Sequence, residues 1–198
     1  MTTFPKNNKL RPLCERIFQQ MERWHEEGKE FFPAPFPSGV PKTLAACLEK
    51  LAYHNFHIWH YENYGRSEQD HLVVFGWQGC QENNKERNLT INAIDDLIRP
   101  HYRKGVPFHS ETLGSLLDRV TIQYLKYLYM RRGNPLLGPQ ILENILALID
   151  CGQELLDQVF AGKIRCLELP RLKHYFFEER NQGPTSLPEV HEGMDSGT

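Results

Sequence analysis

Three stretches of the chain carry polar residues at helix positions that would normally hold leucine or isoleucine. The apolar pattern of residues 44–64, for example, continues through Asn55 and Glu62 on the face that also carries Trp59. Because a buried amide or charge must be matched by a partner, such residues either complete one another or surround a polar ligand. The inward polar residues are Asn55, Glu62 and Arg66, then Asn84, Arg87, Asn88 and Asp95, and finally Glu111, Ser115, Asp118 and Arg119.

The acids in this set are candidate catalytic residues and candidate ligands for a divalent cation. They are Glu62, Asp95, Glu111 and Asp118. Mg²⁺ prefers hard oxygen ligands such as carboxylates, so Mg²⁺ is the cofactor that this cluster would favour. The sequence leaves open whether a metal is bound at all.

The basic and amide side chains of the same helices are candidate ligand-binding residues. Arginine and lysine bind phosphate and carboxylate groups. Beside a bound metal they could support hydrolysis or phosphoryl transfer, with Arg66, Arg87 or Arg119 stabilising charge. The same residues also suit a purely structural network, in which Arg–carboxylate pairs and asparagine bridges fix the register of the helices. The candidate ligand-binding residues are Asn55, Trp59, Arg66, Arg87, Asn88, Ser115, Arg119 and Lys126.

The helices that position these residues are predicted from apolar residues at three- and four-residue spacing. The first runs from Leu10 to about Gly28, and the second from its N-cap, Thr43, to Asn63 or Tyr64. The third is predicted over residues 78–102, after a short packed turn or strand-like segment at residues 72–75, and a fifth begins at Pro139. These elements predict an all-α protein, a single bundle of about five helices.

The fourth helix, which begins near Thr112, is expected to lie at the centre of the bundle. Ser110 or Thr112 can cap its first turn, and its apolar residues form two faces at about 100° per residue. A helix with two apolar faces is buried between its neighbours. Glu111 and Asp118 then lie two turns apart on a buried face, and Gly114 lets another backbone or a ligand approach closely.

The histidines and cysteines are expected to be structural. His54, His57 and His60 follow one another at steps of three, so they drift around the second helix and do not share one face. We expect them to face solvent or the edge of the bundle and not to form a metal site. The five cysteines include no Cys-x-x-Cys pair, and we expect small buried thiols in a reducing compartment. They are Cys14, Cys47, Cys80, Cys151 and Cys166.

Length and composition limit the class of protein. The 198 residues suffice for one domain with a substantial core, and a formal charge of −2 offers no basic surface to nucleic acid. No apolar run reaches the roughly 20 residues of a membrane span, and the polar N-terminus does not resemble a signal peptide. We therefore expect a cytoplasmic protein, and a homo-oligomer is compatible with the sequence. Residues 1–180 are predicted to form the domain, including a Pro-rich loop at 31–41, and residues 181–198 a disordered tail.

Three blocks of the sequence resemble an uncharacterised bacterial family of helical proteins. They are Asn55-x-x-x-Trp59-His60-x-Glu62-x-x-x-Arg66, then Arg87-Asn88 with Ile94-Asp95, then His109-Ser110-Glu111-Thr112-x-Gly114-Ser115-Leu116-x-Asp118-Arg119 with Leu125-Lys126. The family is a domain of unknown function whose members are often encoded near envelope-polysaccharide genes. The resemblance covers roughly residues 44–150 and implies the helical fold and this set of residues, without an established activity.

The chain departs from the pattern of that family at three positions. Leu113, Asn63 and Tyr129 stand where the family has Pro, Asp and His. The changes at Asn63 and Tyr129 remove potential metal ligands, which weakens the expectation of a metal site in this chain.

From the residues and the resemblance together, we expect a protein that binds a small anionic ligand in a polar pocket between helices. The arginines fit a phosphate group, and the resemblance to a family encoded near envelope-polysaccharide genes implies a phosphorylated or nucleotide-linked sugar. Whether the protein is an enzyme stays open. The alternative is a non-enzymatic interaction or scaffold protein, in which the inward polar residues are structural and the Pro-rich loop or the C-terminal arm contacts a partner.

Overall fold

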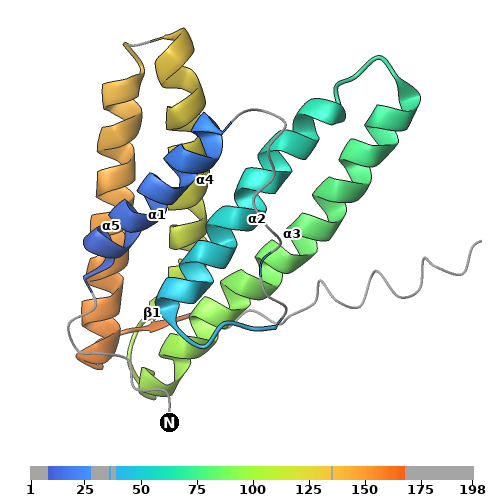
Figure 1. Cartoon of the computed structure of the whole chain (residues 1–198). Coiled ribbons are helices and arrows are strands. Elements are labelled where there is room, and N and C mark those ends of the chain that lie inside the picture. Colours follow the sequence, from blue (N-terminus) through green and yellow to red (C-terminus); the bar gives the residue numbers. More distant parts are fainter. Residues whose placement is uncertain (1–8, 28–35, 37–38, 135, 168–198) are drawn as a thin grey trace, which may run out of the picture. The chain divides into compact units, whose positions relative to one another are not determined.

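Five α-helices make up most of the part of the chain that the structure describes (Figure 1). The computed structural model describes residues 9–27, 36, 39–134 and 136–167. The helices are α1 (Leu10–Glu26), α2 (Leu44–Tyr64), α3 (Asp70–Ile98), α4 (Leu113–Gly133) and α5 (Gly138–Phe160). A 3-10 turn, η1 (Arg99–His101), follows α3, and two short strands, β1 (Phe108–His109) and β2 (Arg165–Cys166), pair in parallel. The prediction of an all-α bundle of about five helices is confirmed.

The helices form two antiparallel pairs, α2 with α3 and α4 with α5, and α1 crosses the second pair (Figure 1). Helix α4 contacts all four other helices, and its Leu113, Leu117 and Leu128 are fully buried. The prediction of a central buried helix is therefore confirmed. No helix of the described residues combines the length and the apolar character that crossing a membrane requires.

Local capping signals in the sequence are present where they were predicted. Thr112 Oγ1 accepts a hydrogen bond from the Ser115 N–H at 3.1 Å, and Thr43 Oγ1 accepts one from the Ala46 N–H at 3.2 Å. Each threonine therefore satisfies one of the N–H groups that the first turn of a helix leaves unpaired. Both helices consequently begin immediately after these threonines, at Leu113 and Leu44.

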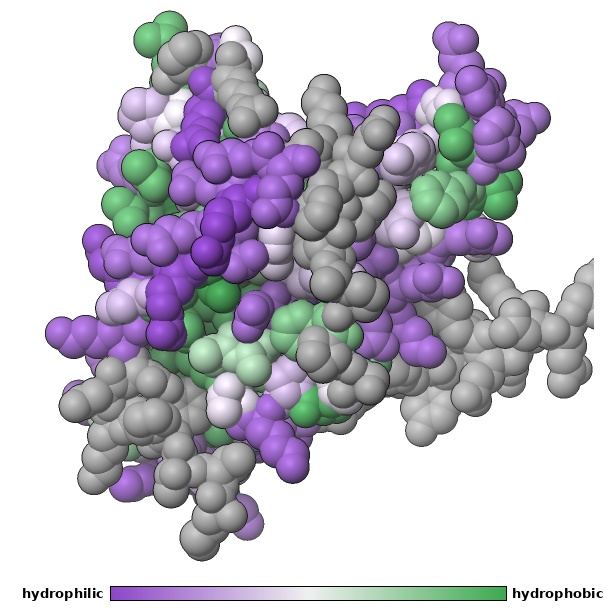
Figure 2. Space-filling model, in the orientation of Figure 1, coloured by the Kyte–Doolittle hydropathy of each residue, from purple (hydrophilic) through white to green (hydrophobic). Residues whose placement is uncertain are grey.

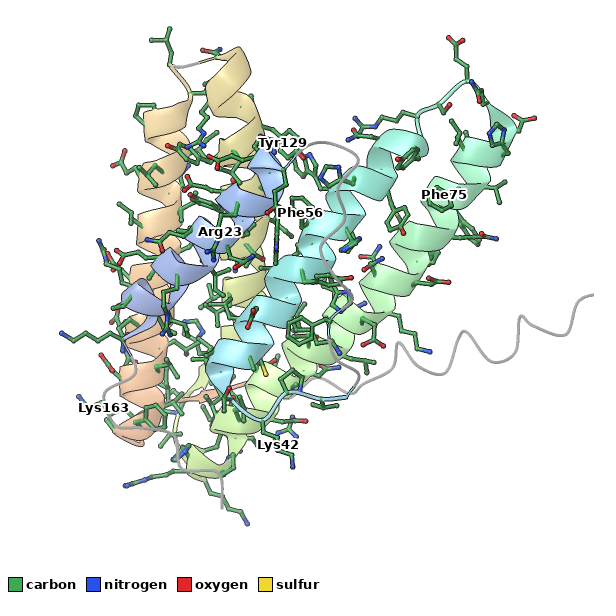
Figure 3. All side chains as sticks on the ribbon, viewed as in Figure 1. Arg23, Lys42, Phe56, Phe75, Tyr129 and Lys163 are labelled. Atoms are coloured by element: carbon green, nitrogen blue, oxygen red, sulfur yellow. The ribbon has the colours of Figure 1, made fainter. Side chains whose placement is uncertain are left out.

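The prediction for the third helix is wrong at its start, because α3 begins at Asp70 rather than near residue 78. The apolar segment of residues 72–75 is helical and belongs to its first two turns. Phe75 points toward α2 in Figure 3, and its ring lies 5.4 Å from the ring of Tyr61 and 5.3 Å from that of Tyr64. These contacts with α2 favour the helix over a turn. The chain leaves the α-helix at Ile98, two residues before Pro100.

The prediction that the histidines of α2 face solvent or the edge of the bundle is also wrong, because His54, His57 and His60 are all buried. Every residue from Lys50 to His57 is buried, since α1, α3 and α4 all contact α2. His54 Nδ1 lies 2.8 Å from Asn83 Oδ1, and His60 Nε2 lies 3.1 Å from the Tyr129 hydroxyl. Packing from three sides therefore buries residues that do not share one helix face.

Four of the five cysteines are buried, as predicted, and Cys151 is exposed, contrary to the prediction. The Pro-rich loop of residues 31–41 falls largely outside the described residues. So do most of the expected C-terminal arm, residues 165–180, and the whole of the expected tail, residues 181–198. Of that arm the structure describes Arg165–Leu167, where the chain forms β2.

Burial makes the histidines of α2 difficult to protonate. Burial, together with the positive charge that His54 or His60 would carry, lowers the pKa of His57 to about 4. Burial also lowers the pKa values of His54 and His60 below the ordinary value. The folded protein therefore binds fewer protons at these sites than the unfolded chain does in mildly acidic solution.

We expect the melting temperature to fall by roughly 5 °C or more between about pH 7 and about pH 4.5. The unfolded His57 takes up a proton near its ordinary pKa of about 6.5, whereas the folded residue does so only near pH 4. The protonation of His57 therefore does not reduce the free energy of unfolding at neutral pH. It reduces it progressively as the pH falls from about 6.5 to about 4. Calorimetry of the wild type and of His57→Gln measures the effect, and the variant should show a smaller decrease. His71→Gln, at an exposed histidine of α3, should keep the wild-type decrease, and an equal decrease in all three proteins would contradict the prediction.

Candidate functional site

The carboxylate of Asp118 lies at the centre of the polar residues that the structure brings together. Arg87 donates to it twice, from Nε to Oδ1 at 2.8 Å and from Nη2 to Oδ2 at 2.5 Å. Asn55 Nδ2 donates to the same Oδ1 at 2.9 Å. The Asp118 side chain is 8% exposed and that of Arg87 is 24% exposed. The hydrogen bond with Asp118 raises the pKa of the Arg87 guanidinium above its ordinary value.

Two further residues complete what we call the Asp118 network: Asn55, Asn84, Arg87, Asp118 and Thr121. Asn55 Nδ2 also donates to Thr121 Oγ1 at 2.7 Å, and that hydroxyl donates to the Asp118 backbone carbonyl at 2.9 Å. Arg87 Nη1 donates to Asn84 Oδ1 at 3.1 Å. The network therefore joins α2, α3 and α4 through side chains that are each matched by a neighbour.

The first turn of α4 forms a second contact with α3. Asp95 Oδ1 accepts a hydrogen bond from the Gly114 N–H at 2.8 Å, which places a carboxylate at the positive end of α4. Burial raises the pKa of Asp95, and the Gly114 N–H acts in the opposite direction. A Cβ atom at Gly114 would collide with the Ile91 carbonyl oxygen. As predicted, Gly114 permits a close approach, and the group that approaches is the backbone of α3.

The prediction that Glu111 shares a buried face of the fourth helix with Asp118 is wrong. Glu111 lies before α4 begins. Arg119 Nη2 lies 2.6 Å from Glu111 Oε2, and the two side chains are 47% and 41% exposed. A solvent-exposed pair of this kind adds little stability. Ser115 is half-buried in the first turn of α4, and its hydroxyl accepts a hydrogen bond from the Thr112 hydroxyl at 3.1 Å.

Several predicted site residues lie away from the Asp118 network. Trp59 is half-buried, and its ring stacks on that of Tyr129 at 4.9 Å. Lys126 is exposed on α4. The predictions that Glu62, Arg66 and Asn88 face inward are wrong, because all three are exposed. Figure 1 shows that the end of the α2–α3 pair diverges from α4, so the helix face that is covered near Asn55 is uncovered near Glu62.

The four candidate catalytic acids do not form one cluster. Within the described residues, no three His, Cys, Asp or Glu side chains are grouped so that they could hold a metal ion. An open depression on the surface lies along α5 and contains none of the predicted site residues. It is lined by Asp150, Gln153, Glu154, Asp157, Gln158, Ala161 and Lys163.

Sequence reasoning missed Thr121 as a member of the network and did not select Asn84 as a site residue. Asn84 had been placed on the inward face, one turn before Arg87. Thr121 lies three residues after Asp118, so the two face the same side of α4. That spacing is the signal that could have identified it.

These contacts define the protein as a helical bundle whose polar core residues join three consecutive helices. The same three helices are the part of the chain that is similar to a known family: residues 45–135 match the family model described as Protein of unknown function (DUF4254). The match contains the whole Asp118 network and the first turn of α4, and it supports the resemblance to an uncharacterised family. No curated protein and no solved structure matches the chain.

We expect Asp118→Asn to lower the free energy of unfolding by about 3 kcal/mol, because it leaves the Arg87 guanidinium partly buried without its carboxylate. Urea denaturation measures the change. The matched control is Asp150→Asn, which removes a carboxylate paired with Arg11 at 2.9 Å, where the side chains are 64% and 47% exposed. The control should unfold as the wild type does. Equal effects of the two substitutions would show that the Asp118 network does not stabilise the bundle.

Proposed function

We propose that this protein is a non-enzymatic interaction protein, in which the inward polar residues hold the helices in register and exposed residues of the α2–α3 pair bind a partner. The observation that carries the proposal is the closure of the Asp118 network. Both carboxylate oxygens of Asp118 accept hydrogen bonds, and all three nitrogens of the Arg87 guanidinium donate them. These groups therefore already have partners from within the chain.

A ligand at this site would have to displace contacts that the chain makes with itself. Separating one member of a buried ion pair from its partner typically costs about 3–5 kcal/mol. Recruiting Arg87 for a phosphate would leave Asp118 buried and unpaired, which makes the network a poor binding site and a good structural element.

The end of the α2–α3 pair offers a surface of the kind that partners bind. Val74, Phe75 and Trp77 are 53%, 46% and 62% exposed. Figure 2 shows hydrophobic residues grouped over this end of the pair. Grouped exposed apolar residues, and aromatic residues in particular, are typical of protein–protein contacts. The Asp118 network would then fix the direction in which the pair presents them.

The second candidate function is the binding or hydrolysis of a phosphorylated or nucleotide-linked sugar. The half-buried carboxyl of Asp95 favours it, because groups whose pKa is shifted by burial are frequent at functional sites. In this reading Asp95 and Glu111 would supply oxygen ligands to Mg²⁺, and Arg119, which pairs with Glu111, would bind the phosphate. Bound Mg²⁺ would supply charge neutralisation for the phosphate oxygens.

Photo-crosslinking tests the interaction function directly. A benzoylphenylalanine in place of Trp77 should give covalent adducts when the full chain is irradiated in the cells that naturally produce it. The same residue in place of Leu136, which is 87% exposed near the start of α5, is the control and should give few adducts. Equal labelling at the two positions would overturn the proposal, because it would mean that the exposed apolar residues of α3 contact no particular protein.

A thermal-shift series separates the two candidate functions. If the second is correct, Mg²⁺ with a nucleotide sugar at about 100 times its dissociation constant should raise the melting temperature by roughly 5 °C. Glu111→Gln should abolish that shift, and Glu143→Gln, at an exposed acid of α5, should retain it. The interaction function predicts no shift in any of the three proteins.

A further inference from the structure

One face of α3 carries exposed residues at helical spacing. Asp70, Val74, Trp77, Gln81 and Lys85 follow one another at steps of three and four, which places them on the same side of the helix. All five are exposed. We call these five residues the α3 outer face.

The opposite side of α3 is held against α2, which fixes the direction of the outer face. Gly76 and Cys80 are buried there. A Cβ atom at Gly76 would lie 2.5 Å from the Gly65 backbone nitrogen and 2.6 Å from the Tyr61 carbonyl oxygen, closer than real Cβ atoms approach. Because the two backbones are already in contact, α3 has no room to rotate its outer face toward α2.

The charges of the α3 outer face are arranged so that the face is complementary to itself. Asp70 and Lys85 lie at its two ends, and the midpoint between them falls between Trp77 and Gln78. The two charged residues are 15 positions apart, which is about 22 Å along the helix. When two copies of α3 lie antiparallel across that midpoint, each Asp70 faces the Lys85 of the other copy. A parallel arrangement would place like charges opposite one another.

We propose that the α3 outer face binds the same face of a second copy of this chain, with the two helices antiparallel. This inference rests on the proposed interaction function and names the partner. A twofold axis at the midpoint brings the two Trp77 side chains together and places each Val74 opposite Gln81 of the other copy. Exposed aromatic residues then form the centre of the contact and opposite charges form its rim, as in many small protein interfaces.

Sedimentation velocity of the full chain tests the self-association. Small interfaces associate weakly, so concentrations from about 1 μM to about 300 μM cover the expected transition. The wild type should change from monomer to dimer in that range. Trp77→Ser should remain monomeric, and Leu136→Ser, which removes a still more exposed apolar side chain elsewhere, should dimerise as the wild type does.

Charge reversal tests the antiparallel register. Asp70→Lys alone and Lys85→Glu alone should each raise the dimer dissociation constant about tenfold, because each places like charges opposite one another at both ends. The double variant should return to within about threefold of the wild type, because its charges are again complementary. Glu143→Lys is the control for a change in net charge and should leave the constant unchanged. Circular dichroism verifies that every variant is folded.

The outcomes separate this inference from the proposed function. A wild type that stays monomeric throughout, or a double variant that fails to recover, overturns the antiparallel self-association. If the adduct formed at position 77 in cells has twice the mass of the chain, the inference is supported. If that adduct contains a different protein, self-association is overturned while the interaction function stands, and if no adduct forms both are overturned.

Discussion

The ion pair between Arg87 and Asp118 is the constraint on which the arrangement of α2, α3 and α4 depends. A carboxylate that is 8% exposed would be strongly destabilising without its guanidinium partner. The three helices must therefore pack so that Arg87 reaches Asp118 from α3 while Asn55 reaches it from α2. Apolar packing alone would tolerate many small rotations of these helices. The directional hydrogen bonds of the network select one of them.

Three of the five residues of this network could be predicted as site residues from the sequence, because each interrupts the apolar pattern of its own helix. Periodicity placed Asn55, Arg87 and Asp118 on inward faces, and all three meet in the structure. The cap at Thr112 was likewise evident from residue type and position. The same periodicity failed at Glu62 and Arg66, because a stripe along one helix does not reveal where its neighbour diverges. That information depends on the angle between α2 and α4.

The sequence also did not reveal that α2 is buried from several sides. The histidines of α2 lie on different faces, and a single apolar stripe would have left some of them in solvent. Three neighbouring helices bury them all. At the start of α3, Gly76 made a helix less favourable on propensity grounds, yet its missing side chain is what lets α3 lie against the backbone of α2. In both cases tertiary contacts outweighed the local preference.

Gly114 and Asp118, one helical turn apart on α4, both contact α3. Inserting or deleting a single residue between them would rotate one against the other by about 100°. Gly114 would then leave Ile91, or Asp118 would leave Arg87, and no shift of α4 along its axis could restore both contacts. Changes in chain length can be absorbed in the turn between α2 and α3, where the end of the pair diverges from α4 (Figure 1). The first two turns of α4 thus have a fixed length, set by two contacts with the same neighbouring helix.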